Sequence, residues 1–149
     1  MNIRFHVQWV RGDRVDQKAF KSKEAYGLFS EYLNRISKFA SCSVSGGLRE
    51  KGSKTGLWVC DRSEDARTFS SEEIAQALKK ICDKGARELR IVIGGPDGFS
   101  KEELNRLAPD LKWSFGPLTL PHELAAVVAG EQMYRAWTIL RGLPYHMGH

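Results

Sequence analysis

The chain carries the sequence LRIVIGGPDG at residues 89–98, and this stretch decides the fold class. Its first half, residues 89–93, is a short and mostly apolar run, as expected of a strand buried on both faces. Its second half, residues 94–98, interrupts the run with a turn. Ser100 and Glu103 follow at the spacing of a capping box, which places the start of a helix directly after the turn. A buried strand that leads through a glycine-rich loop into a helix predicts an α/β fold.

The same alternation of strands and helices extends outward along the chain. Period-two patterning, short apolar runs and turn residues predict strands at 3–9, 41–45, 57–60, 89–93 and 111–115. Helical spacing and capping signals predict helices at 17–37, 71–83, 101–108 and 121–141. The glycine-rich, basic segment 46–56 is expected to be a loop. Together these elements predict a largely parallel sheet with helices on both faces.

Length and composition are those of a single globular domain covering residues 1–149. The chain has 42% hydrophobic and 28% charged residues, which excludes a disordered chain and a collagen-like repeat. No apolar run approaches the roughly 20 residues needed to span a bilayer. The N-terminus alternates apolar and polar residues and lacks the apolar core of a signal peptide. We therefore expect no membrane contact and a cytoplasmic protein.

Charge is distributed unevenly along the chain. The formal net charge is +5; residues 1–67 hold 13 Lys+Arg against 8 Asp+Glu, whereas residues 68–149 hold 10 against 10. A one-sided excess of this size indicates contact with a polyanion, and a solvated basic face is the alternative. The three cysteines, Cys42, Cys60 and Cys82, include no CxxC pair, so we expect reduced thiols and no metal site.

Three predicted strand ends are candidates for a binding site: Cys60-Asp61, residues 94–98 and residues 115–120. Ligands of open α/β sheets bind beyond the carboxyl ends of the strands, and glycine lets a ligand approach the backbone closely. Ordinary tight turns are the alternative. No GxGxxG follows the first strand and no GxxxxGK[ST] occurs, so nothing indicates a dinucleotide or triphosphate site. His122, at a predicted helix N-terminus, is expected to orient or cap rather than act as a base.

Five segments of the second half resemble the RlmH family, the ribosomal RNA large subunit pseudouridine methyltransferases of the SPOUT superfamily. The resemblance covers roughly residues 70–149 and lies in the order and spacing of IVIGGPDG (91–98), WS (113–114), LTLPH (118–122), EQMYRAW (131–137) and PYH (144–146). Any one of these segments alone would be a weak signal, whereas the combination is specific.

The resemblance implies a fold, a reaction and partners. The fold would be a SPOUT-type α/β domain with a C-terminal trefoil knot at roughly residues 89–149. The cofactor would be S-adenosyl-L-methionine, and the protein would be a homodimer. The family methylates N3 of a pseudouridine in large subunit ribosomal RNA and uses the assembled ribosome as its substrate, without a metal ion.

The resemblance also implies site residues. Carried over position by position, the cofactor contacts fall on Cys60, Gly94, Phe115, Gly116, Pro117, Leu118, Thr119 and Leu120. The catalytic, substrate-side groups fall on Arg135, Tyr145 and His146. N3 of a uracil-type ring must lose its proton as it attacks the methyl group, so His146 is expected to serve as the base. Arg135 is expected to stabilise the developing negative charge.

The first half departs from the family pattern. Segment 46–56 is too short for the helix that family members usually place there, and loop 61–67 lacks the usual Gly-Lys. Gln8-Trp9 stand where a glycine is usual, and Met147 stands where a basic residue is preferred. Two alternatives therefore stay open: a catalytically silent homologue that binds the ribosome or RNA, and a SPOUT methyltransferase of another RNA such as transfer RNA.

Overall fold

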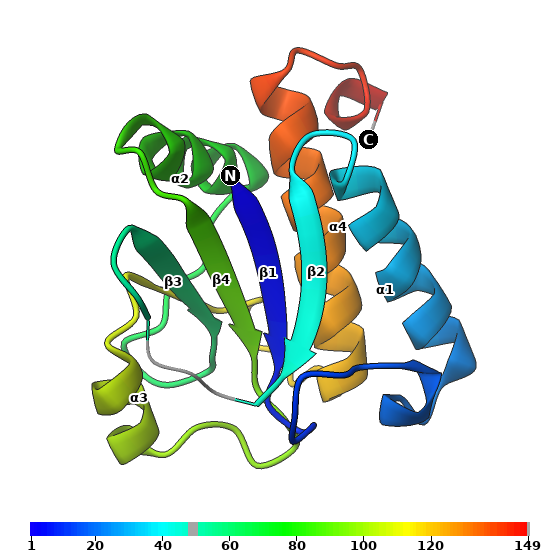
Figure 1. Cartoon of the computed structure of the whole chain (residues 1–149), viewed down its shortest axis with the longest axis vertical. Coiled ribbons are helices and arrows are strands. Elements are labelled where there is room, and N and C mark those ends of the chain that lie inside the picture. Colours follow the sequence, from blue (N-terminus) through cyan, green and yellow to red (C-terminus); the bar gives the residue numbers. More distant parts are fainter. Residues whose placement is uncertain (48–50, 149) are drawn as a thin grey trace.

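The computed structural model describes residues 1–47 and 51–148, which form an α/β fold on one sheet (Figure 1). Within these residues the sheet has five strands in the order β2-β1-β4-β3-β5, and every pairing is parallel. The strands are β1 (Asn2–Val7), β2 (Ser41–Gly46), β3 (Thr55–Cys60), β4 (Glu88–Ile93) and β5 (Leu111–Trp113). The prediction of a largely parallel α/β sheet is confirmed.

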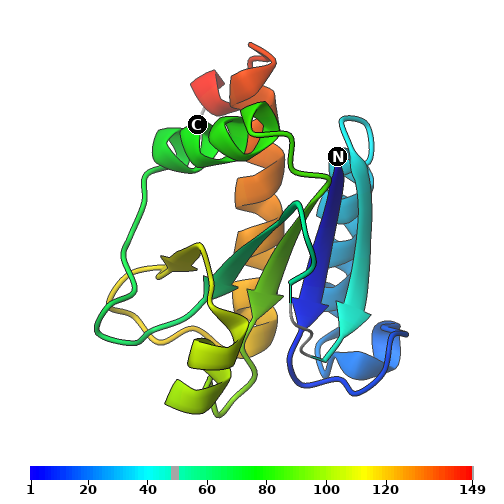
Figure 2. The ribbon, with the colours of Figure 1, turned by 60° about the vertical axis from the view of Figure 1, so that its left-hand side comes forward.

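Helices cover both faces of this sheet, as predicted (Figures 1 and 2). One face carries the helices α1 (Lys23–Ile36), α2 (Ser71–Asp83) and α4 (His122–Leu140). The other face carries α3 (Lys101–Leu107), which packs at the β3 and β4 end of the sheet. Two short 3₁₀ turns, η1 (Gln17–Ala19) and η2 (His146–Gly148), complete the described elements.

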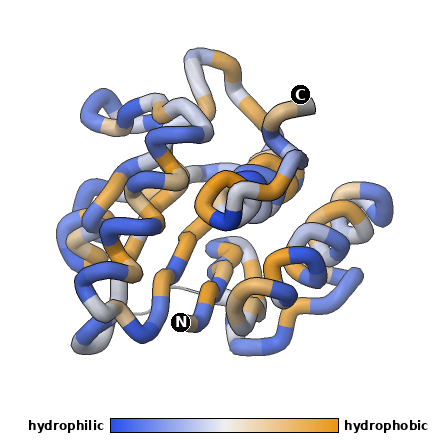
Figure 3. The backbone as a smooth tube through the Cα atoms, turned by 90° about the horizontal axis from the view of Figure 1, so that it is seen from above, coloured by the Kyte–Doolittle hydropathy of each residue, from blue (hydrophilic) through white to orange (hydrophobic). Residues whose placement is uncertain are grey.

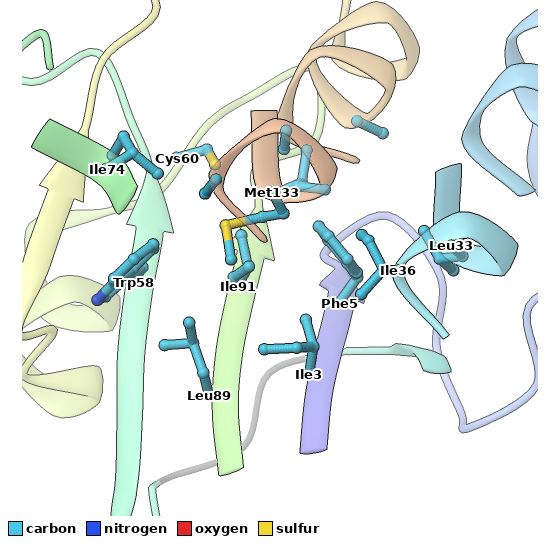
Figure 4. Packing of buried hydrophobic residues seen from close by; sticks show 14 of the residues in the cluster. Ile3, Phe5, Leu33, Ile36, Trp58, Cys60, Ile74, Leu89, Ile91 and Met133 are labelled. Atoms are coloured by element: carbon cyan, nitrogen blue, oxygen red, sulfur yellow. The ribbon is translucent and has the colours of Figure 1, made fainter. Parts of the chain in front are cut away.

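The core follows from the two-residue period of the strands. Alternate residues of β1, Ile3 and Phe5, are fully buried and point toward α1 and α4 (Figure 4). Met133 of α4 lies over the strand residues in the same view. On the opposite face a smaller apolar cluster joins β3 and β4 to α3 through Leu57, Val59, Val92, Leu104 and Leu107. Hydrophilic and apolar residues alternate around the outer helices (Figure 3).

The predicted strand at 3–9 is two residues too long, because β1 ends at Val7. Gln8 and Trp9 form a turn instead. The indole Nε1 of Trp9 donates to the carbonyl of Ala19 at 2.9 Å, and its ring packs edge-on against those of Phe20 and His122. Apolar alternation alone cannot separate a strand residue from a turn residue that packs elsewhere.

The predicted helix at 17–37 is also interrupted. Its first residues form η1, capped by the side chain of Asp16, and α1 begins only at Lys23. Ser22 is the N-cap, and its hydroxyl accepts from the backbone N–H of Ala25 at 3.0 Å. A serine in the middle of a helical pattern is therefore a start signal here rather than an interior residue.

The predicted loop 46–56 is shorter in the structure, since β2 runs to Gly46 and β3 begins at Thr55. Residues 48–50 of this loop lie outside the described residues.

The edge strand β5 is enclosed by a single loop of the chain. On one side it pairs with β3, where the backbone N–H of Asp61 donates to the carbonyl of Trp113 at 3.0 Å. On its other side the N–H of Arg67 donates to the carbonyl of Lys112 at 3.1 Å, and the N–H of Ser114 donates to the carbonyl of Arg67 at 2.8 Å. The two limbs of the connection between β3 and α2 thus flank β5.

Candidate functional site

A cavity of about 580 Å³ lies beyond the carboxyl ends of β3, β4 and β5. Three loops form its walls: residues 60–63 after β3, residues 93–99 after β4, and residues 113–121 around and after β5. The first turn of α4 closes one side through His122 and Ala125. Parallel strands bring their carboxyl ends to one edge of the sheet, which is why loops far apart in sequence meet here.

Most of the residues expected to bind a cofactor line this cavity. They are Cys60, Gly94, Phe115, Gly116, Leu118, Thr119 and Leu120. Pro117 is not among the lining residues. Segments 94–98 and 115–120 therefore leave a hollow between them rather than filling it with their own side chains.

The glycine-rich loop after β4 is held from two sides. The side-chain Oε1 of Gln8 accepts from the backbone N–H of Gly95 at 2.7 Å, which ties the loop to the end of β1. On the other side the ring of Phe99 packs so closely on Gly94 that a Cβ there would lie 2.9 Å from it. Glycine at this position lets the ring pack this closely, and any side chain there would force the ring of Phe99 to shift.

The loop after β5 is held by local and distant contacts. Gly116 adopts φ +105°, a conformation that favours glycine, and its N–H donates to the hydroxyl of Ser114 at 3.2 Å. Across the cavity, Nη1 of Arg62 donates to Oγ1 of Thr119 at 2.6 Å. This bond joins the loops after β3 and β5, which are 57 residues apart in sequence.

The loop after β3 is stabilised by its own polar network. The hydroxyl of Ser63 donates to the carboxylates of Asp61 and Asp65. Nζ of Lys112 on β5 lies 2.5 Å from the carboxylate of Asp65. The hydrogen bonds from Lys112 and Ser63 lower the pKa of Asp65. The network fixes the loop that carries Arg62.

Cys60 closes the inner end of the cavity as a buried thiol. Burial raises its pKa, and the negative charge of Asp61 adds to this effect. The thiol therefore stays protonated at neutral pH and acts as an apolar lining group rather than a nucleophile. Cys42, Cys60 and Cys82 are all free, as expected.

His122, at the start of α4, packs against aromatic and acidic neighbours. Its ring lies edge-on to that of Trp9, with 4.5 Å between centroids, and its Nε2 lies 3.7 Å from Glu123. The sequence predicted Pro121 in the first turn of this helix, but it lies one residue before the helix, at the N-cap position. Its side chain makes no capping hydrogen bond. His122 makes no cap contact in this geometry, and it orients the cavity wall through packing.

The three residues expected to be catalytic come together at the other end of α4. Nη1 of Arg135 lies 3.0 Å from Nδ1 of His146, and the guanidinium lies 4.9 Å above the ring of Tyr145. Arg135 also forms a two-pronged ion pair with Glu131, and the hydroxyl of Tyr145 donates to the same carboxylate at 3.2 Å. We call Arg135, Tyr145 and His146 the tail cluster.

Hydrogen bonding in the tail cluster fixes the tautomer of His146. A guanidinium can only donate, so Nδ1 of His146 accepts from Arg135. Nε2 then carries the proton and donates to Oε1 of Glu72 at 2.6 Å, and this bond lowers the pKa of Glu72. Both imidazole nitrogens are engaged in hydrogen bonds in this arrangement.

Charges elsewhere in the tail cluster are also stabilised. The hydrogen bonds that Arg135 donates to Glu131 raise the pKa of Arg135, so this guanidinium remains cationic. Burial raises the pKa of Tyr145, and hydrogen bonds with Tyr32 and Glu131 add to it. The tail cluster therefore presents a permanent cation beside a neutral phenol.

The cavity and the tail cluster are separated along α4. Ala125 lines the cavity and Arg135 lies ten residues later, which corresponds to about 15 Å along a helix. None of the three tail-cluster residues lines the cavity. Within one chain, most of the expected cofactor residues meet at the cavity and the expected catalytic residues meet in the tail cluster. These two groups lie apart from each other.

Several lining residues were not predicted as site residues. Arg62, Trp113 and Ala125 are the main ones. Arg62 directly follows the Cys60-Asp61 strand end, so its position was a usable signal. Ala125 lies three residues after His122, one helical turn on, and helix periodicity could have found it.

Within residues 1–47 and 51–148, no group of three or more His, Cys, Asp or Glu side chains is placed to hold a metal ion. Across the same residues, no helix has both the length and the apolar character needed to cross a membrane.

The family described as "Predicted SPOUT methyltransferase" matches residues 47–146, which include the cavity loops and the tail cluster. A ribosomal RNA large subunit methyltransferase H from Koribacter versatilis is 39% identical over 155 residues, covering 99% of this chain and all of that protein. This chain belongs to the SPOUT methyltransferase family. The relative of the same name from Stenotrophomonas maltophilia is 38% identical over 138 residues, covering 79% of this chain and 86% of that protein.

Among solved structures, a Legionella pneumophila methyltransferase in complex with S-adenosylmethionine has a TM-score of 0.41 and 18% identity, covering 83% of this chain and 50% of that chain. The family resemblance seen in residues 70–149 is confirmed by the family match, which also reaches back into the connection between β2 and β3.

Proposed function

We propose that this SPOUT methyltransferase transfers a methyl group from S-adenosyl-L-methionine to N3 of a pseudouridine in large subunit ribosomal RNA. One observation carries the proposal: the cavity between residues 94–98 and 115–120 in a chain of this family. The names of the Koribacter and Stenotrophomonas relatives support the RNA class. The excess of positive charge in residues 1–67 suits a polyanionic partner, and we propose a cytoplasmic location because the proposed substrate is an assembled ribosome.

The lining of the cavity fits the proposed cofactor. Its volume of about 580 Å³ lies within the roughly 300–1,000 Å³ of small-molecule sites. Phe115 and Leu120 offer apolar surface for an adenine ring, and the flanking loops offer backbone donors and acceptors. Asp61 and Asp97 supply negative charge, which suits the sulfonium and ammonium groups. We assign Cys60, Gly94 and residues 115–120 to cofactor binding on this basis.

S-adenosyl-L-methionine, when bound, supplies an electrophilic methyl group. The residues of the chain then have two tasks, because N3 of pseudouridine carries a proton and gains negative charge as that proton leaves. We propose that Arg135 stabilises this charge, since its guanidinium stays cationic. Tyr145, kept neutral, is assigned to orient the pseudouridine ring by donating the hydrogen bond that its hydroxyl gives to Glu131 before substrate binds.

His146 is proposed to accept the N3 proton, and its present contacts define what must change first. Nε2 already carries a proton and donates it to Glu72, so Nδ1 is the basic nitrogen. Nδ1 accepts from Arg135, and this bond must open before the imidazole can act as a base. We therefore propose that the tail cluster rearranges when substrate binds.

We further propose a homodimer with sites built from two chains. The cavity and the tail cluster lie about 15 Å apart on α4, so one copy must present its tail cluster to the cavity of the other. A two-fold axis would create two such sites from one self-complementary contact. Leu124 on α4 and Met147 in the tail are exposed apolar residues, which suits burial against a second copy.

The enclosed strand β5 supports the knot expected for this family. β5 hydrogen-bonds to both Asp61 and Arg67, which belong to the same connection between β3 and α2. We propose that this passage is the entry of a trefoil knot within residues 89–149. We also propose that residues 1–149 form one SPOUT domain.

The test of the proposed function is methyl transfer to ribosomes. Assembled ribosomes from a bacterial strain that lacks this modification are incubated with the protein and radiolabelled S-adenosyl-L-methionine, and the nucleosides are identified by mass spectrometry. We expect label in N3-methylpseudouridine of the large subunit RNA. Cofactor binding without transfer would favour the catalytically silent homologue, and label in transfer RNA would favour another RNA substrate.

A further inference from the structure

Arg62 occupies a distinctive place at the mouth of the cavity. It lies two residues after the end of β3, next to Asp61. Its Nη1 donates to Oγ1 of Thr119 at 2.6 Å, and both residues line the cavity. This bond links the guanidinium to the loop after β5, and both side chains are exposed at the surface.

The charge inventory of the lining makes Arg62 informative. Among the described residues that line the cavity, Asp61 and Asp97 are acidic, and Arg62 is the one lysine or arginine. His122 also lines the cavity, and its imidazole ring packs edge-on against Trp9. The described lining thus has a single permanent positive charge, at the loop after β3.

We propose that Arg62 binds the α-carboxylate of S-adenosyl-L-methionine and so fixes the amino-acid end of the cofactor at the loop after β3. This inference rests on the proposed function. The carboxylate is the one negatively charged group of that cofactor, and a guanidinium binds carboxylates with paired N–H donors. Thr119 occupies one of the five N–H donors of Arg62 and leaves four for the ligand.

The geometry favours the cofactor carboxylate over an RNA phosphate. Thr119 belongs to the loop assigned to cofactor binding, and its bond to Arg62 holds the guanidinium over that loop. Asp61 precedes Arg62 and places an acidic group beside it, which suits a ligand end that carries both an ammonium and a carboxylate. A phosphodiester offers no cation for Asp61.

Two ligands that differ only in the carboxylate test this assignment. S-adenosyl-L-methionine and its decarboxylated form are titrated into the wild-type protein and into Arg62→Ala, and dissociation constants are measured by calorimetry. In the wild type we expect the decarboxylated ligand to bind about tenfold more weakly. In Arg62→Ala we expect S-adenosyl-L-methionine to lose about tenfold and the decarboxylated ligand to change little.

Arg67→Ala is the matched control. Arg67 lies in the same loop and loses the same charge, but it packs on Phe69 and does not line the cavity. We expect wild-type constants for both ligands. Arg62→Lys, which keeps the charge and loses the paired donors, should fall between wild type and Arg62→Ala.

Each remaining outcome contradicts the assignment. Equal weakening of both ligands in Arg62→Ala would make the residue a latch for the Thr119 loop rather than a ligand contact. Unchanged binding of both ligands in Arg62→Ala would show that Arg62 contacts RNA or solvent and not the cofactor. If the wild type binds neither ligand, the proposed function fails as well, so the two failures are distinguishable.

Discussion

Single residues hold the cavity open, and Gln8 is the clearest case. Its carbonyl oxygen accepts from Gly95 at 2.7 Å, and its amide nitrogen lies 3.5 Å from the carboxylate of Glu103. Gln8 therefore links β1, the glycine-rich loop and the first turn of α3. A glycine at this point of the chain could not make these bonds, so the departure from the family pattern has a structural purpose.

Replacing Gln8 with Ala should loosen the loop after β4. The N–H of Gly95 loses its acceptor, which costs roughly 1–3 kcal/mol of local order. We expect faster amide hydrogen exchange at Gly95 and about five- to tenfold weaker binding of S-adenosylhomocysteine. Gln17→Ala, an exposed glutamine of η1, is the control. Wild-type exchange at Gly95 in Gln8→Ala would show that the bond does not organise the loop.

His6 predicts a pH dependence of stability. Burial lowers the pKa of His6 from 6.5 to about 4, and the cations Arg90 and Arg4 add to this effect, while Glu88 opposes it. In the unfolded chain His6 binds a proton near pH 6.5, whereas in the folded chain it binds one only near pH 4. The free energy of unfolding should therefore fall by up to about 3 kcal/mol as the pH drops from 6.5 to 4.

Urea unfolding of the wild type and of His6→Gln at several pH values measures this contribution. Other titrating groups are common to both proteins, so the difference between them isolates His6. We expect the gap in stability to change between pH 6.5 and 4, and a constant gap would mean that His6 titrates normally.

At the scale of elements, helix starts depend on both local and distant groups. The capping boxes of α2 (Ser70, Glu73) and α3 (Ser100, Glu103) were predicted from spacing and are confirmed. The predicted start of α1 at residue 17 was wrong, because part of the capping at its true start comes from another helix. The buried carboxylate of Glu123 on α4 accepts from Lys21 at 2.8 Å and Ser22 at 2.9 Å, about 100 residues earlier.

Glu123→Gln tests this link between α1 and α4. Burial alone would raise the pKa of Glu123, but the N–H groups of Lys21 and Ser22 outweigh it and lower the pKa. The carboxylate is thus the form that stabilises the fold. We expect the variant to lose about 1–2 kcal/mol of unfolding free energy at pH 7 by urea denaturation.

Glu31→Gln, at an exposed carboxylate of α1, serves as the control and should change stability by less than about 0.5 kcal/mol. The difference between the variants should also shrink in acid, because a carboxyl with a lowered pKa loses its contribution as the pH falls. An equal effect of both substitutions would assign no special role to Glu123.

At the scale of the whole molecule, the sequence predicted the cavity because its position follows from the order and direction of the strands. Strand ends of a parallel sheet must share an edge, so Cys60, Gly94 and residues 115–120 could be expected to meet. The separation of the tail cluster from the cavity could not be foreseen from motif order. It depends on the length and direction of α4, since His122 begins this helix and Arg135 lies near its end.

Mixed dimers test whether the two groups act across chains. Ala125→Trp fills the cavity from the helix side, and His146→Ala removes the proposed base; each should abolish methyl transfer as a homodimer. In a co-expressed mixture, a hybrid dimer contains one intact cavity facing one intact tail. We expect about a quarter of wild-type transfer from an equal mixture. An inactive mixture that contains isolated hybrid dimers would place each site within one chain.

The central claim is that the loops 94–98 and 115–120 bind S-adenosyl-L-methionine. Titration of isotope-labelled protein with S-adenosylhomocysteine, followed by amide NMR spectra, tests it most directly. We expect saturable shifts that are largest at residues 60–63, 94–98 and 115–120. Saturating shifts confined to other parts of the chain, or no shifts at millimolar ligand, would contradict it.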